Sequence, residues 1–184
     1  MTGARMGAAA GFVLILSTAC SGINAQTNSF ATLAEARQAG AIAKGWIPEG
    51  LPADSHDIRE GHVPGTPQRW GIVDYPYLQE ASLRALLEPD EMSLDRQRCE
   101  IPGRVEWWPV MLRGALDGQR LSSTGIHAYR AKTGNLIFAV NWSQGRAYFW
   151  TPPSPRRMRN DRSVGILPKK SRTRASDARA SSSG

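Results

Sequence analysis

The strongest constraint on the fold lies near the C-terminal end of the 184-residue chain, where three apolar runs alternate with two short connections. The runs are residues 126–131, 136–142 and 147–150. Each connection has four residues and contains a glycine, Gly134 or Gly145, which is typical of β-hairpins. The middle run is apolar on both faces of a strand, so it is expected at the centre of a sheet. The pattern predicts a three-stranded antiparallel meander over residues 126–150.

A helix is predicted well before the meander, over residues 31–44. This segment is rich in alanine, and its apolar residues fall on one helical face. Thr32 and Glu35 have the spacing of a capping box, in which each side chain bonds a free backbone amide at the helix start. Gly45 is expected to end the helix because glycine readily adopts the left-handed conformation found there.

The remaining segments complete an α+β pattern. Residues 68–75 predict a strand, and a second helix is expected over 77–87, starting at Pro76. The charged stretch 89–104 is expected to be an exposed loop. We therefore expect a small globular α+β domain over residues 30–153, with an antiparallel β-meander packed against two helices and disordered termini.

The net charge of +7 is concentrated at one end of the chain. Residues 20–153 carry 13 Lys and Arg against 14 Asp and Glu, whereas residues 154–184 carry nine against two. All six Trp and all four Tyr lie in the first of these segments, so the basic tail has no aromatic ring to stack on a base. No nucleic-acid partner is expected. The tail 154–184 is predicted to be disordered and either adsorbs onto anionic envelope polymers or is an extension without function.

The first 19 residues have the layout of an export signal. Arg5 provides a positive start, and an apolar run follows over residues 8–16. As a helix this run spans about 13 Å, which is too short to cross a ~30 Å hydrocarbon core. Small residues then lead to a cleavage region, so residues 1–19 are predicted to be a signal peptide.

Cys20 stands where a bacterial lipoprotein carries its lipid. The segment 16–20 resembles a lipobox, although Ser17 rather than Leu16 stands three residues before the cysteine. We expect lipidation of Cys20, followed by a polar tether over residues 20–29. The competing interpretation is ordinary signal cleavage after Ala25.

The second cysteine leaves one further alternative open. An oxidising compartment would permit a Cys20–Cys99 disulfide, which lipidation of Cys20 would prevent. Without that bond, Cys99 is expected to be a small buried apolar residue. Ser21 follows the lipidated position instead of aspartate, which favours the outer membrane in a diderm bacterium, with the domain facing the periplasm.

The segment 31–62 resembles a family of small bacterial envelope proteins, many of them lipoproteins, called YbbD-head-domain-like. The resemblance is carried by two motifs, Gly45-Trp46-Ile47-Pro48-x-x-Leu51-Pro52 and Asp57-Ile58-x-Glu60-x-His62. The later run Trp107-Trp108-Pro109-x-x-Leu112 and the end of the meander look similar to the second half of such proteins. The resemblance covers about residues 30–152. It implies a small exported α+β domain with no established enzymatic activity, and it provides no catalytic residues.

One stretch of the chain combines histidines with carboxylates. Its members are Asp54, His56, Asp57, Glu60 and His62. The six-residue separation of the two histidines fits no common zinc motif, so structural roles are expected, and neither a metal nor a cofactor is predicted. His127 is expected in a strand, away from any paired acid, as a core or edge residue.

The tryptophans suggest either a core or a ligand platform. The residues considered are Trp46, Trp107, Trp108, Trp142 and Trp150. Neighbouring residues of a strand face opposite ways, so Trp107 and Trp108 cannot both point inward, and Trp108 is the candidate for exposure. Together with Trp46 and His62, it forms the expected partner surface.

The chain contains no sequence signature of a known catalytic centre. It lacks a nucleophile elbow, a P-loop and a dinucleotide fingerprint, and nothing distinguishes Glu100 and Glu106 as an acid pair. We expect an exported, lipid-anchored envelope protein with a non-enzymatic binding or structural role, whose partners are the membrane and an envelope protein or polymer. The alternatives are an inhibitor or immunity protein against a toxin, and a small cell-wall hydrolase.

Overall fold

The computed structural model describes residues 25–102 and 105–153, so the predicted signal peptide, Cys20 and the basic tail lie outside the described residues. The elements in chain order are β1 (Gln26–Thr32), α1 (Leu33–Gln38), β2 (His56–His62), β3 (Arg69–Asp74), η1 (Tyr77–Gln79), α2 (Glu80–Ala85), β4 (Arg98–Cys99), η2 (Val110–Leu112), β5 (Gly114–Ala115), α3 (Gly118–Ser123), β6 (Ile126–Arg130), β7 (Ile137–Asn141), η3 (Trp142–Gln144) and β8 (Arg146–Trp150). The elements labelled η are single 3-10 turns.

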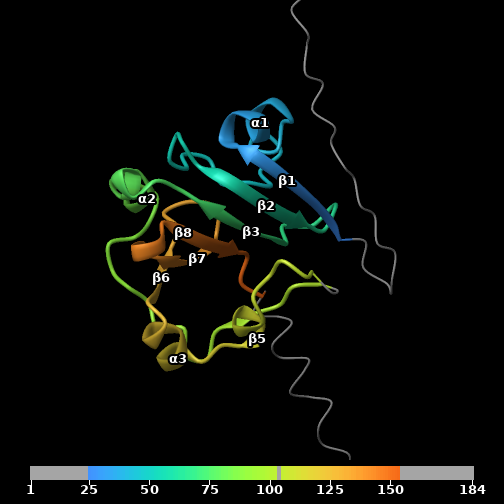
Figure 1. The fold of residues 1–184 in the computed structure, drawn as a ribbon. Helices are drawn as coiled ribbons and strands as arrows, with labels where there is room; N and C mark the ends of the chain where they lie inside the picture. Colours follow the sequence, from blue (N-terminus) through green and yellow to red (C-terminus); the bar gives the residue numbers. More distant parts are fainter. Residues whose placement is uncertain (1–24, 103–104, 154–184) are drawn as a thin grey trace, which may run out of the picture. The chain divides into compact units, whose positions relative to one another are not determined.

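Within the described residues the main sheet has six antiparallel strands in the order β1-β2-β3-β8-β7-β6 (Figure 1). The predicted meander is confirmed, because β7 pairs with β6 on one side and with β8 on the other. All five residues of β7 are buried, as expected for a central strand. The predicted α+β class is also confirmed, and residues 25–102 and 105–153 contain three short α-helices in place of the two expected.

Both faces of the sheet are covered by apolar side chains. Because side chains alternate along a strand, Phe138 and Phe149 pack on one face while Ile137 and Trp150 pack on the other. The first face is covered by α1, the loop 39–52 and α2, and the second by residues 92–101 and 105–121. Figure 1 shows α1 and the part of the chain with β5 and α3 on opposite sides of the sheet.

The first predicted helix is shorter than expected. The chain remains a strand through Thr32, and α1 ends at Gln38, close to Gly40 with its left-handed φ of 75°. The Thr32 half of the capping box is confirmed, because the amide of Glu35 donates to the Thr32 hydroxyl at 3.2 Å. The Glu35 carboxylate reaches one residue beyond the N-cap and accepts from the amide of Ala31 at 2.9 Å. The capping signal was correct, but the strand entering it was not anticipated.

The tether prediction was wrong for residues 26–29. They belong to β1, which pairs with β2 from Gln26↔His62 to Thr32↔His56. The segment is polar and short of apolar residues, so nothing local favoured a strand over a flexible linker. Pairing with a distant strand decides its conformation.

Two further segments differ from the expectation. The second helix is split into the 3-10 turn η1 and α2, and within α2 the guanidinium of Arg84 pairs with the Glu80 carboxylate at 2.7 Å. The stretch 89–104 is not simply an exposed loop, because Leu94 and Cys99 are buried against the second face of the sheet. A sheet face rich in large apolar residues requires such a cover.

Candidate functional site

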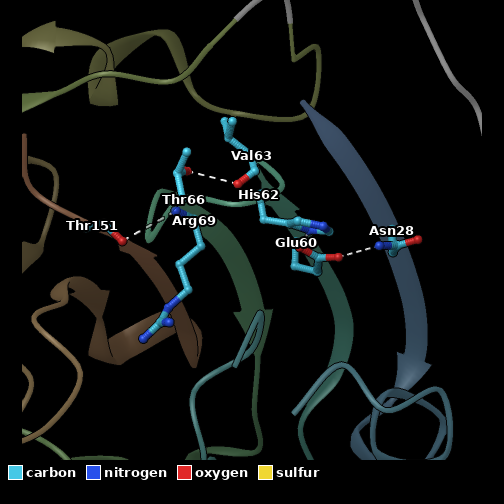
Figure 2. A network of polar contacts seen from close by, with 7 residues as sticks. All are labelled: Asn28, Glu60, His62, Val63, Thr66, Arg69 and Thr151. Carbon is cyan, nitrogen blue, oxygen red and sulfur yellow. Dashed lines mark hydrogen bonds and ion pairs between the residues drawn. The ribbon is translucent and has the colours of Figure 1, made fainter. Parts of the chain in front are cut away.

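A buried acid–histidine pair lies on β2. The side chain of Glu60 is fully buried and that of His62 nearly so, and the Nδ1 atom of His62 lies 3.0 Å from Oε2 of Glu60. The side-chain amide of Asn28, directly across in β1, donates through Nδ2 to Oε1 of Glu60 (Figure 2). Each carboxylate oxygen therefore has a hydrogen-bond partner, as a buried carboxyl group requires.

Trp46 covers this pair. Its ring stacks on that of His62 with a centroid separation of 4.0 Å and an interplanar angle of 14°. The ammonium of Lys44 lies 4.5 Å from the indole centroid, in a cation–π arrangement. Gly45, between Lys44 and Trp46, has a left-handed φ of 72° that allows the loop to turn over the sheet. The structure thus brings together the Gly45-Trp46 motif and the Glu60-x-His62 motif, which are separate in the sequence.

Burial controls the electrostatics of the pair. Desolvation raises the pKa of Glu60, while the hydrogen bonds from Asn28 and His62 and the nearby His62 charge act in the opposite direction. The carboxyl group therefore holds a proton more readily than an exposed glutamate does. At 3.0 Å, the carboxyl group is close enough to exchange a proton with His62. Neither Glu60 nor His62 lines either of the two cavities described below.

Arg69 extends the polar network along β3, opposite His62. Its amide donates to the Thr151 hydroxyl at 3.4 Å, and its guanidinium donates to the carbonyl of Gly134 at 3.3 Å. Burial lowers the pKa of Arg69. The neighbouring turn is closed by the Thr66 hydroxyl, which donates to the carbonyl of Val63 at 2.9 Å (Figure 2).

The other histidines lie apart from this pair. His56 is exposed at the far end of β2, and its Nδ1 lies 3.1 Å from the carbonyl of Asp54. His127 lies on the edge strand β6, but the expectation that it lacks an acid partner was wrong, because Glu91 is 3.0 Å from its Nδ1. In the described part of the chain, no group of three or more His, Cys, Asp and Glu side chains is arranged to hold a metal ion.

The expectation of an exposed Trp108 was wrong. This side chain is 2% exposed, and its indole nitrogen donates to the carbonyl of Leu112 at 2.8 Å. Its ring meets those of Tyr148 and Trp150 edge to face. The two rings do differ in burial, and Trp107 is the half-buried member. Strand alternation is not the cause, because residues 107 and 108 lie in a turn before η2.

Trp107 lines a cavity of about 260 Å³ beside β1 and β2. The lining residues are Ser29, Phe30, Ala31, Asp57, Ile58, Arg59 and Trp107. Sequence reasoning did not select Ser29 or Arg59, because they approach Trp107 only after the sheet has formed. The one feature of the sequence that pointed to this cavity was the Trp107-Trp108 pair, which implied that one indole is accessible.

A second, larger cavity of about 520 Å³ lies beside β6 at the opposite edge. It is lined by the segment 91–95, by α3 and by Ile126 and Ala128 of β6. Its acidic groups include Glu91, which already contacts His127. No residue of this cavity was predicted as a site.

Comparison with known proteins identifies the first part of the domain. Residues 24–72 match the family model of the YbbD head domain. The resemblance of this part is therefore confirmed, and it indicates an envelope-associated protein of uncertain function. No curated protein and no solved structure matches the chain.

The YbbD head match has a clear structural extent. It begins just before β1 and ends at Ile72, within β3. The buried pair, Asn28 and the covering Trp46 therefore lie wholly inside it, whereas Trp107 lies outside it.

Among the described residues, no helix combines the length and apolar character needed to span a membrane.

Proposed function

We propose that this chain is an exported envelope protein, anchored by a lipid on Cys20, whose folded domain binds another macromolecule without catalysing a reaction. The export layout of residues 1–19, the position of Cys20 and the YbbD head match support the localisation. In a diderm bacterium, Ser21 favours the outer membrane with the domain on the periplasmic side.

The start of β1 adds a geometric consequence to lipid anchoring. Five residues, 21–25, separate Cys20 from Gln26, where β1 begins. Even a fully extended chain covers at most about 22 Å from Cys20 to Gln26. A lipid on Cys20 would therefore hold the domain close to the membrane surface, within reach of partners in or near the bilayer.

The observation that carries the binding role is the contrast between the buried pair and the Trp107 cavity. Both oxygens of Glu60 are engaged inside the domain, and the His62 ring is covered by Trp46. The cavity beside β1 instead presents a partly exposed indole next to Arg59 and Asp57. Aromatic and arginine side chains at the surface are the groups that most often anchor partners.

The anchoring is tested by expressing the full chain and its Cys20→Ala variant in a diderm host. We expect the wild-type protein to partition into detergent with a lipid-bearing Cys20 at its mature N-terminus, and the variant to lose both properties. A Ser21→Asp variant is the matched control, and it should remain lipidated but move to the inner membrane. A soluble wild-type product that starts at Gln26 would contradict the anchor.

The absence of catalysis is tested separately. The purified chain and a Glu60→Gln variant are incubated with purified cell-wall polymer, and released soluble fragments are measured by mass spectrometry. We expect no release by either protein. Release by the wild type that the variant abolishes would overturn the binding role and make Glu60 part of a hydrolase.

A further inference from the structure

The two edge strands of the main sheet differ in whether another part of the chain bonds to their outer side. The outer side of β6 is covered by the chain itself, since the amides of Glu88 and Met92 donate to the carbonyls of Arg130 and Ala128, both at 2.8 Å. At the opposite edge, β1 pairs with β2 on its inner side, and no strand of the described residues pairs with its outer side. One edge is closed, whereas the other offers backbone groups for pairing.

β1 also lacks the features that usually protect an edge. Natural edge strands carry charges, prolines or bulges, or are very short. β1 has seven residues, Gln-Thr-Asn-Ser-Phe-Ala-Thr, without a charge or a proline, and its pairing with β2 is regular from Gln26 to Phe30. Glu35 already occupies the amide of Ala31, so the open stretch comprises residues 26–30.

The cavity of about 260 Å³ lies at this same open edge. Ser29 and Ala31 of β1 line it together with Arg59 of β2, and Trp107 adds an aromatic wall. A strand added beside β1 would direct alternate side chains toward this face of the sheet. One of them would meet the Trp107 cavity, and the opposite charges of Asp57 and Arg59 favour a side chain without net charge.

We infer that β1 binds an extended peptide segment of a partner protein as an additional strand, with one large uncharged side chain seated in the cavity beside Trp107. In this mode, backbone hydrogen bonds provide affinity and the side-chain cavity provides selectivity. A second copy of the chain fits less well, because the β1 residues that line this face, Ser29 and Ala31, are too small to fill the partner's cavity. The inference rests on the proposed binding role and specifies the ligand class.

The test uses three seven-residue probe peptides that alternate threonine and valine and carry phenylalanine, leucine or alanine at the centre. Binding to the full chain in mild detergent is measured by calorimetry, and backbone amide shifts locate the site. A phenylalanine peptide with methylated backbone nitrogens on alternate residues controls for strand pairing. Ser29→Lys places a charge on the open edge, and Ser82→Lys makes the same change on exposed α2 as a matched control.

We expect the phenylalanine peptide to bind more tightly than the leucine peptide and the alanine peptide to bind weakest, with amide shifts centred on β1. Ser29→Lys should weaken binding at least tenfold, Ser82→Lys should leave it unchanged, and methylation should abolish it. Trp107→Ala should remove the preference for a large central side chain. If thermal melting shows that this variant is unfolded, Ser29→Lys alone decides the test.

Three results would overturn the inference: no binding by any probe, binding unaffected by Ser29→Lys, or a wild-type dimer that Ser29→Lys dissociates. The last result would assign the edge to a second copy of the chain. The outcome is separate from that of the anchoring experiment, because a soluble product starting at Gln26 would retain β1 and its cavity. Cleavage of wall polymer would refute the binding role without affecting the peptide measurement.

Discussion

Replacing each of the two adjacent tryptophans with phenylalanine should have very different effects on stability. Trp108→Phe removes the indole nitrogen that donates to the carbonyl of Leu112 at 2.8 Å, in a part of the core where Leu112 is fully buried. A buried carbonyl left without its donor costs about 1–3 kcal/mol, and the smaller ring leaves unfilled volume. We expect a total loss of about 2–4 kcal/mol in unfolding free energy.

Trp107→Phe should cost less than about 1 kcal/mol, because this side chain is only half-buried and the phenylalanine ring retains much of its contact with Trp108. Both values are measured by urea denaturation followed by far-ultraviolet circular dichroism, which reports mainly on the backbone. Tryptophan fluorescence is avoided as the probe because each substitution removes an indole. Equal costs, or a larger cost for Trp107→Phe, would refute the assignment of the buried and accessible rings. Iodide quenching gives an independent check, since Trp107→Phe should reduce the quenchable emission and Trp108→Phe should not.

Three other substitutions or reactions test particular features of the domain. Burial raises the pKa of Glu60 from 4.5, so its contribution favours the fold at low pH and is lost as the pH rises from 4.5 through the raised pKa. The difference in unfolding free energy between Glu60→Gln and wild type, measured by urea denaturation, should therefore shift in favour of the variant as the pH rises through this window. A difference that stays constant with pH would contradict the burial of the carboxyl group. Thr32→Ala should lower the unfolding free energy by about 1 kcal/mol through loss of the capping bond, whereas no change in the urea midpoint would mean that the cap is dispensable. Burial strongly raises the pKa of the Cys99 thiol, so iodoacetamide should modify it at pH 8 only in urea, and rapid native modification found by mass spectrometry would refute its burial.

Features with a local cause were predictable from the sequence. The capping box at Thr32 and Glu35 depends on residues three apart, and the hairpins around Gly134 and Gly145 depend on four-residue connections. The central position of β7 followed from a run that is apolar on both faces. In each case the interacting residues are neighbours in the chain, so their pattern contains the necessary information.

The candidate site was predictable only in part. Trp46 and His62 were both selected as surface residues, but the structure stacks them on each other and buries His62. The bond from Asn28 to Glu60 joins residues 32 positions apart, and Asn28 was assigned to a tether. Trp107 and Trp108 differ in exposure because of the cover that residues 92–101 and 105–121 form over the sheet, which alternation within one short run cannot reveal.

The sequence by itself determined the meander, the helix cap, the α+β class and the resemblance of the first segment to the YbbD head family. Only the tertiary structure decided that residues 26–32 form an edge strand, that Glu60 and His62 are buried, and that Trp107 rather than Trp108 reaches the surface. The physical reason is the range of the interactions. Caps and hairpins arise between residues a few positions apart, whereas strand pairing and burial depend on which distant segments come to lie against each other.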